Sequence, residues 1–541
     1  MAKVILINPS YMRTYGSNHA GIANPVYPIL SLAVLAGIAK EHGHDARIID
    51  LSYRTYDPNY LRDIMVSYKP DVVGITATTP LVNQMRDISF LVKDISKNII
   101  TIGGGAHPSS MPYETMKESA LDMVAVGEAD LTFAEVLDGK SFDSIQGIYY
   151  REGEDIVQNL ARPMVKYLDD LPFPAWELYP IDEYRSRLTK IIAKKSPLTT
   201  IEFSRGCVFK CDFCGSKQTM GLGYRKKSPE RCADEVEHAY NLGYRELLLT
   251  DDIFTSDNKW AIQVCEAISR RNVKMAWTCT NGIRVDSADT ALFQAMKKAG
   301  CYRVHFGFES GNDRVLKEFG KGGKATLEQG LVAVKNARKA GLDTWGMYMV
   351  GLSSDTEETM QDTIDYSKQT PVDIIKYGIT VPFPGTPMFN EYFSKGLIKT
   401  LNWDDYNLYN DISPIFSHPR LSWETIQKYY KKAYVHTYYL NPGYILRRLW
   451  RGIKTGEFFL DIYYGTRFLF MLIKHPKLIE EDNYAYRNKW EPINIKASDI
   501  RGNEYQQSKQ SAWKALDIER GKINSDDTEP IVEEEVFIPV Q

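Results

Sequence analysis

Three cysteines close together are the clearest sign of chemistry in this chain. Cys207, Cys211 and Cys214 have the spacing C-x3-C-x2-C within the segment SRGCVFKCDFCGS. Three thiolates bind three irons of a cubane [4Fe–4S] cluster and leave the fourth iron with open coordination positions. A structural zinc ion is the alternative, but it needs a fourth ligand, for which the next helix offers only Cys232 or His238. The spacing therefore favours a reactive iron–sulfur cluster.

The other cysteines do not form a second motif. Cys232, Cys265, Cys279 and Cys301 lie in helical or strand patterns, where a thiol behaves as a small apolar residue. The first residues, MAKVILINPS, contain an apolar run that is too short for a signal peptide. Seven cysteines in such a chain predict reduced thiols in the cytoplasm rather than a disulfide framework.

Further polar residues follow apolar runs in the middle of the chain. Asp251 and Asp252 follow ELLLT, Asn281 and Arg284 follow KMAWTCT, and Glu309 ends YRVHFGFE. If these runs are parallel strands, the polar side chains gather with the three cysteines at the carboxyl edge of one sheet. Carboxylates can accept hydrogen bonds from an amino group there, and a guanidinium can pair with a carboxylate.

A second set of residues lies at expected strand ends in the first 130 positions. Glycines there would let a ligand approach the backbone closely, and ligands of doubly wound sheets bind at this edge. The candidate ligand-binding residues are Asn8, Ser10, Thr78, Gly104, Gly105, His107, Gly127 and Glu128.

The elements that position both sets alternate regularly. The first part contains the apolar runs VILIN (4–8), ARIIDL (46–51), DVVGITA (71–77), IITIGGG (99–105) and DMVAVGE (122–128). Near-continuous apolar strands separated by helix-length segments predict a doubly wound, Rossmann-like parallel sheet. Six more runs between positions 199 and 381 predict a second parallel α/β unit, a partial (βα)6 barrel.

The remaining sequence and the composition complete the predicted organisation. The 541 residues are 43% hydrophobic and 25% charged, a composition that allows several hydrophobic cores. The net charge of −3 provides no positive electrostatic field that would attract nucleic acid. The sequence contains no run of about 18 uncharged apolar residues and therefore predicts no membrane span. The predicted units are a Rossmann-like domain (1–145), a linker (146–195), the partial barrel (196–400), a mainly helical C-terminal region (401–520) and an acidic mobile tail (521–541).

The segments around these residues resemble the radical S-adenosylmethionine (SAM) superfamily, and in particular its group with an N-terminal cobalamin-binding domain. The resemblance rests on the cysteine loop together with LLLTDDIFTSD, CTNGIRVD, VHFGFESGNDRVL, MYMVGLSSDTEET and VPFPGTPM, and on GGGAHPSSMP and VGEAD in the first domain. It implies a [4Fe–4S] cluster, SAM and cobalamin as cofactors, and a reducing electron donor such as flavodoxin or ferredoxin. Ser353 stands where the resembled group would have proline.

The resemblance also implies roles for the candidate residues. The three cysteines would hold the cluster, while Asp251, Asp252, Asn281, Arg284 and Glu309 would contact SAM. The strand-end residues of the first domain would contact cobalamin. None of the nine histidines lies in the pattern D-x-H-x-x-G that supplies a cobalt ligand, and in the nearest segment, SNHAG, Ser17 replaces the aspartate two residues before His19. We therefore expect no histidine to bind cobalt, and His107 to bond within its loop.

Two reactions are compatible with these motifs, and the substrate is open. The main prediction, which the resemblance implies, is that a 5′-deoxyadenosyl radical from SAM abstracts a hydrogen atom from the substrate and that methylcobalamin then transfers a methyl group to this unactivated carbon. Because YYLNPGYILRRLWR resembles a segment of anaerobic magnesium-protoporphyrin ester cyclases, an oxidative cyclase is the alternative, and a non-catalytic cobalamin- or zinc-binding module is a second one. Arg447, Arg448, Arg451 and Lys454 alternate with Leu446, Leu449 and Trp450. Such a helix could contact a membrane or a lipid substrate, but a helix packed on the barrel with solvated arginines is the favoured interpretation.

Overall fold

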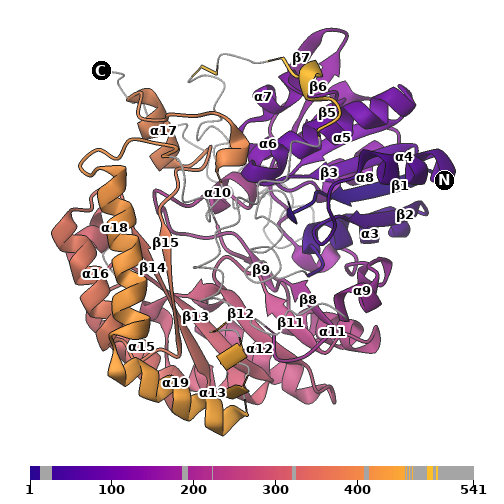
Figure 1. Cartoon of the computed structure of the whole chain (residues 1–541). Helices are drawn as coiled ribbons and strands as arrows, with labels where there is room; N and C mark the ends of the chain where they lie inside the picture. The colour runs from indigo at the N-terminus through magenta and orange to yellow at the C-terminus, as the bar shows by residue number, and fades with distance from the viewer. Residues whose placement is uncertain are drawn as a thin grey trace, which may run out of the picture.

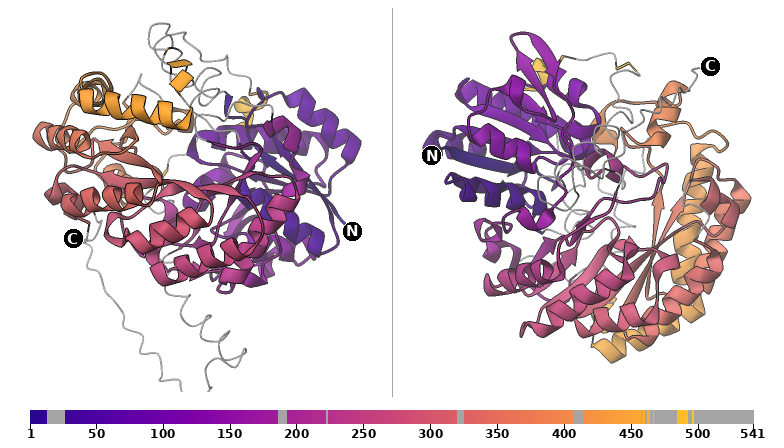
Figure 2. Two further views of the ribbon diagram at one scale, coloured as in Figure 1. Left: turned by 90° about the horizontal axis from the view of Figure 1, so that it is seen from below. Right: turned by 180° about the vertical axis from the view of Figure 1, so that it is seen from behind.

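The computed structural model places two α/β units side by side, with the C-terminal helices against the second (Figures 1 and 2). It describes residues 1–12, 27–185, 193–221, 223–319, 325–406, 414–456, 484–491 and 495–496, together with positions 458, 459, 462, 463 and 466. His19 and the predicted tail 521–541 therefore lie outside the described residues.

The first unit is a seven-stranded sheet whose first five strands are parallel. The strand order is β2 (Asp45–Asp50), β1 (Lys3–Asn8), β3 (Val72–Thr76), β4 (Ile100–Gly104), β5 (Met123–Ala125), β6 (Ile148–Glu152), β7 (Asp155–Gln158). Its helices are α3 (Leu30–Glu41), α4 (Pro58–Tyr68), α5 (Val82–Ile95), α6 (Ala106–Ser110), α7 (Pro112–Lys117) and α8 (Asp130–Leu137). The predicted Rossmann-like fold is confirmed, but β6 and β7 add antiparallel strands from within the segment expected to be a linker.

The second unit is a six-stranded, wholly parallel sheet in chain order, as predicted for a partial barrel. Its strands are β8 (Leu198–Ile201), β11 (Glu246–Leu249), β12 (Ala276–Ile283), β13 (Cys301–Glu309), β14 (Asp343–Val350) and β15 (Ile374–Ile379). The principal connecting helices are α11 (Pro229–Asn241), α12 (Asn258–Arg270), α13 (Thr290–Lys298), α15 (Leu327–Lys339) and α16 (Glu357–Gln369). Figure 1 shows these helices on the outside of the curved sheet.

Local sequence signals explain where these helices begin. Thr326 and Thr356 each form a capping box, in which the threonine hydroxyl and the side chain three residues later bond to each other's backbone N–H. The carboxylates of Asp257 and Asp289 cap α12 and α13 in the same position. Each cap therefore fixes the residue at which its helix begins on the outside of the sheet.

The cores join parts that are far apart in sequence. The core of the first unit also contains Phe389, Tyr392, Trp403 and Phe416, which follow the last barrel strand β15 in the chain. In the C-terminal region, α18 (Trp423–Tyr434) continues through the π-helical turn Val435–Tyr439 into α19 (Pro442–Thr455). No helix in the described part of the chain is long and apolar enough to span a bilayer.

Candidate active site between two sheet edges

The three cysteines lie on the loop between β9 (Ser204–Arg205) and α10 (Ser216–Thr219), which follows the first barrel strand. Gly206 turns the chain into this loop with φ +83°, and a Cβ at this position would lie 2.1 Å from the carbonyl oxygen of Gly223. Only glycine fits such a left-handed turn against backbone. The loop is therefore fixed at the residue before Cys207.

The thiols of this loop are partly enclosed. Burial raises the pKa of Cys207 and of Cys214, while the backbone of Phe209 donates a hydrogen bond to the first thiol and that of Ser216 to the second. Amide hydrogen bonds to sulfur are a regular feature of iron–sulfur sites, where they tune the reduction potential. The loop thus carries three cysteine thiols, two of which have amide donors.

The two residues considered as a fourth zinc ligand have other surroundings. In the described part of the chain, no three His, Cys, Asp or Glu side chains converge as ligands of one ion would. Of the two residues considered as a fourth zinc ligand, Cys232 is fully buried in the barrel core and His238 packs against Phe173 and Trp176.

Asp252, Arg284 and Glu309 surround the cysteine loop. Asp252 accepts a hydrogen bond from the Gly206 N–H at 3.1 Å. After burial, its negative charge contributes to the raised pKa of Cys207 and of Cys214. The charge of Glu309 also raises the pKa of Cys214. The three strands β11, β12 and β13 therefore bring their terminal polar residues to the loop, as the sequence predicts.

Arg284 and Glu309 are held in specific conformations. The Arg284 guanidinium lies 3.5 Å from the ring centroid of Phe209 in the cysteine loop and binds both carboxylate oxygens of Asp286, at 2.9 and 2.7 Å. Glu309 has φ +63°, beside a register shift between β13 and β14. A non-glycine residue in this region is strained, and such strain clusters at functional sites.

The other two residues expected to contact SAM differ in accessibility. The buried Asp251 carboxylate accepts hydrogen bonds from Phe203 N–H at 2.8 Å and from the Ser204 hydroxyl, which anchor the strand below the loop. Burial raises the pKa of Asp251 to about 7. Asn281 is exposed at the end of β12 and donates to the Thr250 carbonyl at 2.6 Å. Asn281 is thus open to a ligand, whereas Asp251 already supports the loop.

The edge of the first sheet is open at Thr78 and Gly104. Thr78 is exposed after β3, and a Cβ added to Gly104 at the end of β4 would meet no atom within 4 Å. Gly105 has φ +104°, and its Cβ would lie 2.7 Å from the Ala77 carbonyl. The Gly127 N–H donates to the Ser109 hydroxyl at 3.0 Å. Thr78 and Gly104 therefore leave this part of the sheet edge accessible to a ligand.

The side chains of Asn8, Ser10 and His107 have other partners. Asn8 donates to the buried Asp50 carboxylate at 2.8 Å, and the Ser10 hydroxyl donates to the Arg54 carbonyl. His107 is fully buried, where its two ring nitrogens lie 3.3 Å from the Thr79 hydroxyl and the Glu114 carboxylate.

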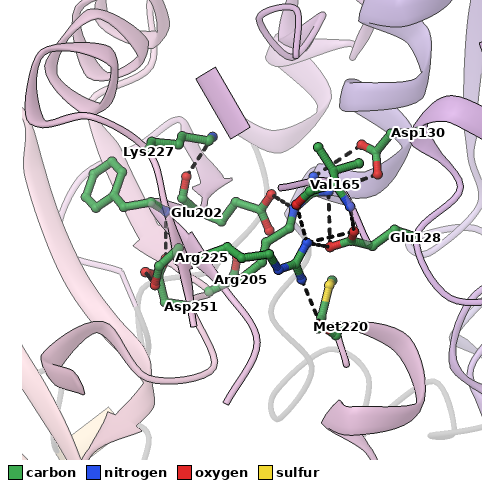
Figure 3. A network of polar contacts seen from close by, with 12 residues as sticks. Glu128, Asp130, Val165, Glu202, Arg205, Met220, Arg225, Lys227 and Asp251 are labelled. Carbon is green, nitrogen blue, oxygen red and sulfur yellow. Dashed lines mark hydrogen bonds and ion pairs between the residues drawn. The ribbon is translucent and has the colours of Figure 1, made fainter. Parts of the chain in front are cut away.

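The two sheet edges meet across a buried ion-pair cluster, which we call the interdomain cluster: Glu128, Asp130, Glu202, Arg205 and Arg225 (Figure 3). Arg205 lies 2.9 Å from Asp130 and Arg225 lies 2.7 Å from Glu128, so that barrel cations bind first-domain carboxylates. Next to it, α10 packs against α6. The cysteine loop is therefore fixed beside the open edge of the first sheet.

Comparisons with known proteins agree with this arrangement. A model of the radical SAM superfamily matches residues 201–367, and a model of the B12 binding domain matches residues 22–137. An uncharacterized methyltransferase of Pyrococcus horikoshii is 33% identical over 454 residues, which cover 81% of this chain and 94% of that protein. The chain belongs to the cobalamin-dependent radical SAM enzymes.

Two further matches lie within the same group. An anaerobic magnesium-protoporphyrin IX monomethyl ester cyclase of Rubrivivax gelatinosus is 26% identical, with 76% of this chain and 73% of that protein covered. The solved structure of the cobalamin-dependent SAM radical enzyme OxsB superposes with a TM-score of 0.65 at 16% identity, over 97% of this chain and 81% of that one. At 16% identity, the superposition with OxsB shows that the two proteins share a fold.

As a cobalamin-dependent radical SAM enzyme, the chain uses a [4Fe–4S] cluster, SAM and cobalamin. The observed residues fit these groups, because the loop offers three cysteine thiols, two of them with amide donors, and Gly104 leaves the end of β4 open to a ligand. The individual contacts assigned to the cofactors from the sequence stay predictions.

Sequence reasoning did not find Arg205, Arg225 or Trp403. The Trp403 indole donates to Glu114 at 2.7 Å and its ring packs 4.8 Å from that of His107, although 296 positions separate the two residues in sequence. Arg205 directly precedes Gly206 and Cys207, and this adjacency was the only signal available. Their partners come from the other domain, which no local pattern specifies.

Proposed function

We propose that this enzyme transfers a methyl group from SAM to an unactivated carbon of a small-molecule or lipid substrate. The observation that carries the proposal is the 33% identity to a protein named as a methyltransferase over most of both chains. The geometry supports it, because α10, directly after Cys214, packs on α6, directly after Gly105. A substrate between these edges would face both cofactor sites.

The chain's own residues would bind and orient the reactants. Cys207, Cys211 and Cys214 would hold the cluster as thiolates, and Asp252 and Glu309 would accept hydrogen bonds from the SAM amino group. Arg284, held by Asp286 and Phe209, would bind a carboxylate or ribose hydroxyl. When bound, the cluster, SAM and cobalamin supply an electron, a 5′-deoxyadenosyl radical and a transferable methyl group. A small reducing protein such as a flavodoxin or ferredoxin would deliver the electron.

Asn281 and the open edge of the first domain complete the proposed site. The exposed Asn281 amide can bind a polar group of SAM, and Thr78, Gly104 and Gly105 would lie against the corrin ring. Hydrogen-bond donors and acceptors fixed in this way reduce the reorganisation needed when charge changes during reaction.

Labelled SAM tests the proposal. The reconstituted enzyme, a reductant and SAM with a deuterated methyl group are incubated without oxygen with lipid, peptide and pigment fractions of cells. We expect a labelled product, with S-adenosylhomocysteine and 5′-deoxyadenosine formed in similar amounts. Product that contains no label, with 5′-deoxyadenosine alone, would contradict methyl transfer.

An oxidative cyclisation is the second candidate. It is supported by the likeness to a magnesium-protoporphyrin ester cyclase, whose matched region covers 76% of this chain. The same experiment separates the two reactions, because a cyclase forms an unlabelled, oxidised product and no S-adenosylhomocysteine.

A further inference from the structure

Helix α19 turns its apolar side chains toward solvent. Leu446, Trp450 and Ile453 are 66%, 69% and 64% exposed, and Ile445 and Leu449 lie on the same side of the helix. In a helix packed on a domain, the apolar stripe normally faces the core. The orientation of α19 is therefore the reverse of the usual one.

The arginines of α19 face the barrel instead. Arg451 is buried and its guanidinium lies 2.6 Å from the Asp343 carboxylate at the start of β14, while the Tyr444 hydroxyl donates to the Asp373 carbonyl at 3.2 Å. Arg447 and Arg448 are half-buried. The helix packs on the barrel as expected, but the expectation of solvated arginines is wrong, because Arg451 binds Asp343 and the other two arginines are half-buried.

The exposed apolar surface extends beyond one helix. Eleven of the nineteen exposed large hydrophobic residues in the described part of the chain lie between positions 435 and 463, so their distribution is strongly biased to this region. We define the outer face by the exposed apolar residues of α19 and of the turn before it: Val435, Tyr439, Leu440, Ile445, Leu446, Leu449, Trp450 and Ile453. A concentration of exposed apolar side chains of this kind is typical of an interaction site.

Basic residues flank the outer face. Lys428 and Lys431 are exposed on α18, on the same side of the helix as Val435. Lys339 is exposed at the end of α15. Its neighbour Arg338 is close enough to Arg447 for its charge to contribute to the lowered pKa of Arg447, after burial. Lys297 of α13 reaches the same corner and donates to the Gly341 carbonyl at 2.6 Å. α19 itself contains no Asp or Glu, and its barrel partner Asp343 is already paired with Arg451.

We propose that the outer face docks the enzyme on the surface of an anionic lipid bilayer. An apolar face with Trp and Tyr, flanked by lysines, is the composition of helices that lie in the bilayer interface. The lysines would attract anionic headgroups, and the leucines, isoleucines and Trp450 would enter the acyl boundary. Charge complementarity thus selects an anionic surface over a neutral one.

Docking in this position leaves the candidate active site accessible. Asp343 begins β14 and Asp373 directly precedes β15, so α19 lies at the amino ends of these strands. The cysteine loop lies at the opposite, carboxyl end. Figure 1 shows α19 at the outer end of the barrel, away from the first domain.

Vesicle flotation of the full chain tests the proposal. We expect binding to vesicles of phosphatidylcholine plus phosphatidylglycerol, and a fall of at least about tenfold in the partition coefficient for Leu446→Asp/Trp450→Asp. Leu160→Asp is the matched control, because Leu160 is also highly exposed but lies in the first unit. Circular dichroism establishes that the variants remain folded, which the exposure of all three positions predicts.

A second variant tests the electrostatic part without changing the outer face. Lys428→Gln/Lys431→Gln should lower binding to the anionic vesicles by about thirtyfold at low salt. No binding of the wild-type chain, or equal binding to vesicles of phosphatidylcholine alone, would overturn the proposal. So would a lipid-free dimer that Leu446→Asp/Trp450→Asp converts to monomers, because the occupant would then be a second copy of this chain.

Discussion

At the scale of single residues, the seven cysteines fall into two environments. Cys207, Cys211 and Cys214 are half-exposed on one loop, whereas the other four cysteines are buried in the barrel core. Burial raises the pKa values of Cys265 and Cys301 as well, so these core thiols remain protonated at neutral pH. Accessibility therefore distinguishes the candidate ligands from packing residues.

Replacement of any loop cysteine by alanine should abolish cluster assembly. We expect the iron content of the anaerobically reconstituted protein to fall from about four per chain to below about one, because no other thiol is accessible at the loop. The matched controls are Cys232→Ala, Cys265→Ala, Cys279→Ala and Cys301→Ala. They should keep their iron and lose about 1–2 kcal/mol of unfolding free energy. Iron loss in a control variant would contradict the three-ligand assignment.

The partners of His107 bear on how cobalt is held. Both ring nitrogens face the Thr79 hydroxyl and the Glu114 carboxylate, so we expect no histidine nitrogen on cobalt. The electron paramagnetic resonance spectrum of bound cob(II)alamin should therefore lack nitrogen superhyperfine splitting. A splitting that disappears in His107→Ala or His19→Ala would show that a histidine binds the metal.

His305 predicts a pH dependence of stability. Burial, and then the charge of Arg303, lower its pKa to about 3. Between this value and 6.5 the unfolded chain binds a proton that the folded chain does not, so stability is lost as pH falls through this range. From pH 7.5 to 5 the wild type should lose about 2 kcal/mol more than His305→Gln in urea unfolding. An equal loss in both proteins would mean that His305 is protonated in the folded state.

At the scale of elements, the turns at the strand ends determine which residues face a ligand. Gly105, in the turn from β4 to α6, packs against the Ala77 carbonyl at the end of β3, while its neighbour Gly104 faces open space. The two glycines thus have different reasons to lack a side chain. One is required by the fold, and the other is available to a ligand.

The substitutions Gly104→Ala and Gly105→Ala separate these reasons. Gly104→Ala should leave the thermal midpoint of the apoprotein unchanged but weaken cobalamin binding by about tenfold or more, because a methyl group would occupy the proposed corrin surface. Gly105→Ala should destabilise the apoprotein by about 1–3 kcal/mol, because its φ is +104°. Binding titrations followed by absorbance and thermal unfolding measure the two effects. Unchanged cobalamin affinity in Gly104→Ala would remove this edge from the proposed site.

At the scale of the whole molecule, the interdomain cluster and the C-terminal residues connect the two units. Arg205 binds Asp130 of the first domain one residue before the cysteine loop turns at Gly206. On another side, Tyr486 N–H donates to Asp87 at 2.6 Å, so the C-terminal segment also binds α5 of the first domain. These contacts set the relation between the two candidate cofactor sites.

Arg205→Gln should uncouple the two sites. Without the positive charge of Arg205, the buried negative charges of Glu128, Asp130 and Glu202 are less well neutralised. Removing one member of a buried ion pair costs about 3–5 kcal/mol of folding stability. We expect more 5′-deoxyadenosine per methylated product, and a changed dipolar interaction between cob(II)alamin and the reduced cluster in electron paramagnetic resonance. Lys226→Gln removes the exposed ion pair with Asp257 and should change neither readout. An unchanged spectrum in Arg205→Gln would assign this residue to stability alone.

The sequence by itself determined the local features of this protein. The cysteine spacing and the apolar strand runs act over fewer than about ten positions, and they predicted the three candidate ligands, both parallel sheets and the carboxyl-edge location of the site. Tertiary structure decided which polar side chains remain available there. Asp251 and Asp252 are adjacent in sequence, yet one is buried under Phe203 and Ser204 while the other reaches the cysteine loop. Likewise, the periodicity of α19 predicted an amphipathic helix but not which of its faces packs on the barrel. Asp343 and Asp373, about 70 to 108 positions away, bind the polar face. Pairings across such separations depend on the fold as a whole, which no local pattern specifies.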